Sequence, residues 1–122
     1  MTGLTPKPKS LYRVLPLPVV QRDAKKLLTP QQLREGIVMA KLLRHYPNLA
    51  ELSIERCGSG MELRIESPAI NVQGWLRAIF YAHEKSRTIY IVDLFWKKTN
   101  RVTTADLHRM EHRIRQLKEL LK

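Results

Sequence analysis

Apolar residues recur at helical spacing in the first part of the chain. Over residues 29–46 the period is close to 3.6, with apolar side chains at Leu33, Ile37, Ala40 and Leu43. Thr29 is a good helix cap, Pro30 suits the first helical position, and Gln32 completes a capping box. The pattern therefore predicts a helix that begins at Thr29 and ends near residue 46.

Shorter elements are predicted before this helix. Apolar residues favour a helix over residues 18–28, and residues 11–15 alternate in the manner of a strand. Pro16 and Pro18 end that strand, because proline interrupts the backbone hydrogen bonding of a sheet. Residues 1–10 contain two further prolines and are expected to form a flexible lead.

The period changes from 3.6 to 2 after residue 50. Apolar and polar residues alternate over residues 51–55 and again over 62–66. If Ile54 lies opposite Leu63, Gly58 and Ser59 form a two-residue loop, and glycine at its first position suits a type II′ turn. This predicts a β-hairpin whose polar face carries Ser53, Glu55, Glu62, Arg64 and Glu66.

Two apolar strands and a helix are predicted for the rest of the chain. Residues 75–82 and 88–96 are rich in β-branched and aromatic residues on both faces, which is typical of central strands. Thr103 begins the final helix, with Asp106 placed to complete its cap. One face of that helix is apolar, with Leu107, Met110, Ile114, Leu117 and Leu121.

This order of elements predicts an α+β fold in one domain over residues 11–122. The expected layout is an N-terminal strand, two helices, a twisted antiparallel sheet of about four to five strands, and a C-terminal helix. A chain of 122 residues is long enough for one such core.

Composition adds a strong charge imbalance to this picture. The chain has 22 Lys+Arg against 11 Asp+Glu, a net charge of +11, and the excess is concentrated in residues 85–122. A folded basic surface of this kind is typical of proteins that bind a polyanion or an acidic protein. The single cysteine, Cys57, excludes a disulfide framework and a zinc ribbon. No signal-peptide or membrane-spanning stretch is present, so a cytoplasmic protein is expected.

Three short motifs, in order and at hairpin spacing, resemble one protein family. They are Glu62-Leu63-Arg64-Ile65, the pair Arg77 and Tyr81 with three residues between them, and Phe95-Trp96-Lys97-Lys98-Thr99 before the last helix. In these the chain resembles the RelE/HigB/ParE toxin superfamily, most of all its phage-derived HigB-like branch. One position departs from the pattern: several relatives have a histidine where this chain has Asp93.

The resemblance implies a basic cleft on a twisted sheet and a toxin of a type II toxin–antitoxin system. Such a toxin is an endoribonuclease that cuts messenger RNA, usually on the ribosome, and an acidic antitoxin encoded nearby silences it. The implied catalytic residues are Arg64, Arg77, Tyr81, Lys97 and Lys98. Further contacts to nucleic acid are expected from Arg87, Phe95, Arg101, Arg109 and Arg113. No cofactor and no metal are expected.

These residue types suit the chemistry of RNA cleavage by the 2′-hydroxyl. That reaction builds charge on the phosphate, and preorganised arginine and lysine side chains can stabilise it. Tyr81 lies on the same strand face as Arg77 and can stack on a base or transfer a proton. Lys97 and Lys98 are adjacent in a strand, so they point to opposite faces unless a bulge intervenes.

Each candidate also has a purely structural interpretation. Arg64 can form ion pairs with Glu62 and Glu66, the lysine pair can be a solvated strand end, and Tyr81 can belong to the core. For His108 and His112, one helical turn apart, ordinary surface positions are favoured over a metal site, because no third ligand is evident.

Two other functions share the same expected fold. ParE-like members of the superfamily inhibit DNA gyrase without cutting RNA, and a basic domain can also bind nucleic acid without being toxic. The retention of two arginines, a tyrosine and a lysine pair favours cleavage, and the fold alone does not separate the three functions.

Overall fold

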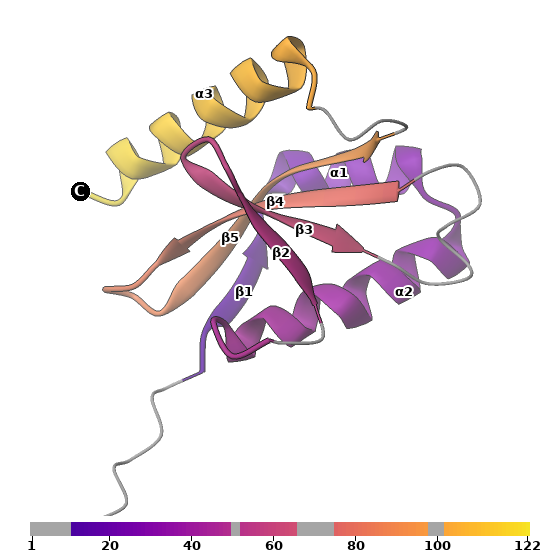
Figure 1. The fold of residues 1–122 in the computed structure, drawn as a ribbon, viewed down its shortest axis with the longest axis horizontal. Helices are drawn as coiled ribbons and strands as arrows, with labels where there is room; N and C mark the ends of the chain where they lie inside the picture. The colour runs from indigo at the N-terminus through magenta and orange to yellow at the C-terminus, as the bar shows by residue number, and fades with distance from the viewer. Residues whose placement is uncertain (1–10, 50–51, 66–74, 98–101) are drawn as a thin grey trace, which may run out of the picture.

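A computed structural model describes residues 11–49, 52–65, 75–97 and 102–122 of the chain (Figure 1). The elements are β1 (Arg13–Pro16), α1 (Pro18–Leu27), α2 (Pro30–Lys41), a 3-10 helix η1 (Leu42–His45), β2 (Ser53–Cys57), β3 (Gly60–Ile65), β4 (Trp75–His83), β5 (Thr88–Lys97) and α3 (Thr104–Leu120). The α+β class is confirmed. The expected flexible lead, residues 1–10, lies outside the described residues.

The five strands form a mixed sheet, not a fully antiparallel one. Their order is β1-β5-β4-β3-β2. The pairs β2–β3, β3–β4 and β4–β5 are antiparallel, as predicted. The exception is β1, which pairs parallel with β5, with Val14 opposite Ile89. Alternation along a strand indicates which side chains share a face but carries no information on strand direction, so this pairing was not predictable from the pattern.

Helices cover both faces of the sheet (Figure 1). On one face α1, α2 and η1 enclose a core that includes Leu43, Leu63 and Phe80. On the other face α3 packs over a smaller cluster that includes Ile79 and Met110. The conspicuous apolar character of β4 and β5 on both faces follows from this three-layer arrangement.

The helix beginning at Thr29 has the predicted capping box. The Thr29 hydroxyl accepts from the Gln32 backbone N–H at 3.2 Å, and the Gln32 side chain accepts from the Thr29 N–H at 3.0 Å. The α-helix ends at Lys41, earlier than predicted, and the chain continues to His45 as a 3-10 turn. A tighter last turn of this kind is common at helix ends.

The predicted hairpin is confirmed in its register and its turn. Ile54 lies opposite Leu63 and Cys57 opposite Gly60, which leaves Gly58 and Ser59 as the loop. Gly58 has a φ of 56°, in the left-handed region that favours glycine.

A β-bulge interrupts the pairing of β4 with β5. Ile79 lies opposite Asp93 and Phe80 opposite Ile91, so Val92 is the additional residue of β5. Val92 and Asp93, though adjacent in sequence, therefore both belong to the face that α3 covers.

Candidate nucleic-acid interface

Two predicted site arginines and Phe95 lie in one row across three strands. Arg64 on β3 is the register partner of Arg77 on β4, and Arg77 is the register partner of Phe95 on β5. Neighbouring strands are about 4.8 Å apart, so the three side chains stand side by side on the α3 face of the sheet. We call Arg64, Arg77 and Phe95 the arginine row.

Arg77 forms an ion pair with Glu62, a residue that the sequence pattern did not assign to the site. The Arg77 Nη1 atom lies 2.6 Å from Glu62 Oε1, and these side chains are 8% and 7% exposed. Because both charges are buried, each compensates the desolvation of the other. Glu62 thereby restricts the guanidinium to one orientation, beside a half-buried Arg64.

A second buried carboxylate, Asp93, connects α3 to the sheet. Its Oδ1 atom accepts from Arg113 Nη1 at 2.9 Å and from the Leu94 backbone N–H at 2.9 Å, and its Oδ2 atom accepts from Arg109 Nε at 3.0 Å. Asp93 is only 1% exposed. We call Asp93, Arg109 and Arg113 the Asp93 clamp.

The clamp places Arg109 at the end of the arginine row. The Arg109 guanidinium lies 5.9 Å from the centre of the Phe95 ring, within the range of a cation–π contact. Burial opposes its charge, but hydrogen bonds to Asp93 and then to Asp106 outweigh burial and raise the pKa of Arg109 above its ordinary value. Its side chain is 37% exposed, so Arg109 remains accessible to solvent while Arg113, at 16%, is mostly covered.

Tyr81 lies on the same strand face as Arg77, as predicted, but not in the same site. Ile79, between them on β4, is fully buried in the cluster beneath α3. Tyr81 instead contacts the C-terminal part of that helix, where the Lys118 ammonium lies 5.3 Å from its ring centre. The helix therefore separates Tyr81 from the arginine row.

The remaining predicted residues are distributed more widely. Arg87 lies in the β4–β5 turn, at the opposite end of these two strands from the arginine row. Its guanidinium stacks 3.9 Å from the centre of the Tyr12 ring. Lys97 is the last residue of β5, two positions beyond Phe95 and hence at a register position on the same face. Lys98 and Arg101 lie outside the described residues.

A third carboxylate, Glu111, fastens α3 to the hairpin turn. Its two oxygens accept from the Ser59 backbone N–H and hydroxyl, each at 2.6 Å. The Ser59 hydroxyl and then its N–H lower the pKa of Glu111 below its ordinary value. Neither this contact nor the Asp93 clamp has a local sequence signal, because both join segments far apart in the chain.

Two sequence comparisons give no match. No protein-family profile matches the chain, and no curated protein matches it in sequence. Across the part of the chain that the structure describes, no group of three or more His, Cys, Asp or Glu residues could hold a metal ion. Within those same residues no helix is both long and apolar enough to cross a membrane.

Proposed function

We propose that this protein is an endoribonuclease toxin of a type II toxin–antitoxin system that cleaves messenger RNA. The 2′-hydroxyl attacks the adjacent phosphate, the bond to the 5′-oxygen breaks, and a 2′,3′-cyclic phosphate remains; water takes the hydroxyl proton and protonates the departing oxygen. The observation that carries the proposal is the arginine row, with Arg109 at its end. Three cationic side chains and an aromatic ring converge on one sheet face. Guanidinium groups suit phosphate oxygens, and the buried Phe95 ring supports the Arg109 guanidinium through their cation–π contact.

The cations differ in their exposure to solvent, which suits them to different roles in binding RNA. Arg77, fixed by Glu62, offers a preorganised charge that needs no reorientation when phosphate charge develops. Arg64 and Arg109 are more open to solvent and are suited to first contact with the RNA backbone. Lys97, the last residue of β5, adds one more positive charge two residues beyond Phe95.

Asp93 does not take the role of the histidine found in several members of the resembled family. Both of its oxygens accept hydrogen bonds from arginines, and its carboxylate is buried beneath α3. Its oxygens are therefore occupied by α3 and are not turned toward the open part of the arginine row. We therefore assign Asp93 to holding α3, and the proposed chemistry rests on charge stabilisation by the cations.

A second candidate is a ParE-like inhibitor that binds DNA gyrase without cleaving RNA. The observation that favours it is the separation of Tyr81 from the arginine row, because cleavage then lacks the tyrosine beside the phosphate-binding cations. In this alternative the same basic face serves as a protein-binding surface.

Induction in a bacterial host separates the two candidates. We expect early decay of transcripts, in advance of any DNA-damage response, and we expect Arg64→Gln to abolish the decay. Arg34→Gln, on the exposed side of α2 and on the other face of the sheet, makes the same charge change and should leave decay intact. DNA-damage signalling with stable transcripts would support the gyrase inhibitor instead.

The proposed partner is an acidic antitoxin encoded nearby. A protein with a net charge of +11 attracts an acidic segment electrostatically, which accelerates association and makes it sensitive to salt. Co-expression with the adjacent gene, followed by a pull-down, should give a stable complex and restored growth. Normal growth of a host producing this chain alone would contradict the toxin proposal.

A further inference from the structure

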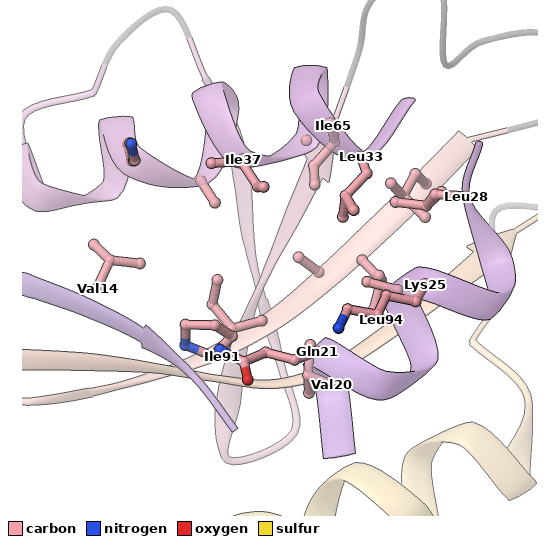
Figure 2. Close-up of a pocket in the computed structure, with 17 residues that line it drawn as sticks. Val14, Val20, Gln21, Lys25, Leu28, Leu33, Ile37, Ile65, Ile91 and Leu94 are labelled. Carbon is pink, nitrogen blue, oxygen red and sulfur yellow. The ribbon is translucent and has the colours of Figure 1, made fainter. Parts of the chain in front are cut away.

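A cavity lies on the side of the sheet away from the arginine row. It measures about 460 Å³, is open to solvent on one side, and is lined by α1, α2 and the strands (Figure 2). Its floor consists of Ile65, Leu76, Ala78, Ile91 and Leu94. Cavities of this size are typical of small-molecule sites, and this one lies on the opposite face from the residues of the proposed function.

Gly36 keeps the cavity open. It is the one buried residue of α2, and a Cβ placed on it would meet a single neighbouring atom, Leu28 Cδ1, at 4.0 Å. No close packing therefore requires a glycine here, although glycine in the middle of a helix is less favourable than alanine by about 1 kcal/mol. A larger side chain at this position would project into space that the fold leaves empty.

The chemistry of the lining defines a ligand class. Its polar side chains are Gln21, Lys25 and Lys41, and no aromatic or acidic side chain lines the cavity among the described residues. In Figure 2 Gln21 and Lys25 extend from α1 into the space between the helix and the sheet. The Gln21 amide and the Lys25 ammonium, one helical turn apart on α1, complement one anionic head. Aliphatic walls without aromatic rings suit a flexible hydrocarbon chain better than a planar ring system.

We propose that this cavity is a binding site for a free aliphatic monocarboxylate, with the hydrocarbon chain on the sheet floor and the carboxylate beside Gln21 and Lys25. Burial of the chain supplies most of the affinity, and the exposed Lys25 contributes orientation and a smaller, salt-sensitive part. The proposal is independent of toxin activity, because the two sites lie on opposite faces of the sheet.

Calorimetric titration of the full chain with decanoate, below its micelle-forming concentration, tests the site. We expect saturable binding of one molecule, weakened about tenfold for octanoate, because each buried methylene contributes to affinity. Decan-1-ol should bind equally to the parent and to Lys25→Gln, whereas decanoate should bind Lys25→Gln severalfold more weakly. Lys41→Gln, the same charge change at the other end of the cavity, should have a smaller effect on decanoate. An absence of saturable decanoate binding would overturn the proposal.

Position 36 supplies a matched pair of variants. Gly36→Leu fills the cavity and should abolish decanoate binding, whereas Gly36→Ala should retain it; both should melt at higher temperature than the parent. Equal binding by Gly36→Leu and the parent would place the ligand elsewhere and refute the site. In the parent protein, decanoate should also shift the methyl resonances of Ala24 and Ala40, and unchanged resonances would contradict it without any variant.

Vesicles of phosphatidylglycerol distinguish the free carboxylate from a membrane lipid. A basic protein adsorbs to such vesicles through its net charge, so adsorption should be the same for Gly36→Leu and the parent. Loss of vesicle binding in Gly36→Leu would show that the cavity takes a phospholipid chain and would overturn the proposed ligand class.

Discussion

Glu62 and Arg77 meet diagonally across β3 and β4, with 2.6 Å between carboxylate and guanidinium. They are not register partners, because Glu62 lies opposite Ile79 and Arg77 opposite Arg64. The diagonal contact fixes Arg77 alongside a second positive charge. The same ion pair therefore serves both the stability of the sheet and the proposed phosphate site, and substitutions can separate these roles.

Arg77→Ala should lower the free energy of unfolding by about 3–5 kcal/mol, because it leaves the buried Glu62 carboxylate without this guanidinium. The apolar pair Glu62→Leu/Arg77→Met should recover most of that loss and still abolish transcript decay. Urea unfolding and induction assays measure the two effects. A toxic double variant would show that Arg77 has a structural role alone.

Asp93→Asn should destabilise the protein by about 3–5 kcal/mol, because two arginines lose a buried negative charge. We expect the loss to appear first as faster hydrogen exchange in α3, the element that the clamp holds. Asp23→Asn is the control: Asp23 lies 3.7 Å from Arg113 but is 29% exposed, so its effect should remain below about 1 kcal/mol. Equal effects would contradict the clamp.

Glu111→Gln should reduce stability at neutral pH and have little effect in acid. The Ser59 hydrogen bonds lower the pKa of Glu111 in the folded state. A lowered folded-state pKa stabilises the protein above the ordinary titration range of glutamate, and that contribution disappears as the pH falls through the folded value. Thermal melts across the acid range should therefore converge for the parent and Glu111→Gln. Glu119→Gln, the same change at an exposed position of the same helix, is the matched control.

Arg64→Gln, Lys97→Ala and Lys98→Ala should each weaken RNA binding and lower its salt slope by about one. The reason is that each cation contacting a phosphate releases about one counterion on binding. Arg34→Gln, on the opposite face, should leave the slope unchanged. Identical slopes for the parent and all three variants would place the RNA elsewhere on the protein.

Local patterns predicted most of the secondary structure. The hairpin was correct in register and turn because alternation and Gly58 gave two independent signals for the same loop. The Thr29 capping box was correct because its donors and acceptors are three residues apart. The parallel pairing of β1 with β5 was missed, since it depends on how the intervening helices return the chain.

The candidate site was predictable where it depended on strand alternation and not where it depended on α3. Arg64 and Arg77 could be assigned to one face from the sequence, and the register confirms it. The separation of Tyr81 from them depends on the position of α3 over Ile79, which no local pattern encodes. The buried partner of Arg77 was missed because Glu62 was matched only with its neighbour Arg64.

Because of the bulge at Val92, β5 can lose one residue without a change of register, whereas β4 cannot. The strand contains one residue more than its ladder can pair, so a chain without Val92 could still present Ile91 and Asp93 to their present partners, Phe80 and Ile79. Loss of one residue from the middle of β4 would instead turn every side chain beyond it toward the opposite layer of helices. Two adjacent strands of one sheet thus differ in how they tolerate a change in chain length. A variant without Val92 would keep the other side chains of β5 on their present faces and lose only the buried valine beneath α3.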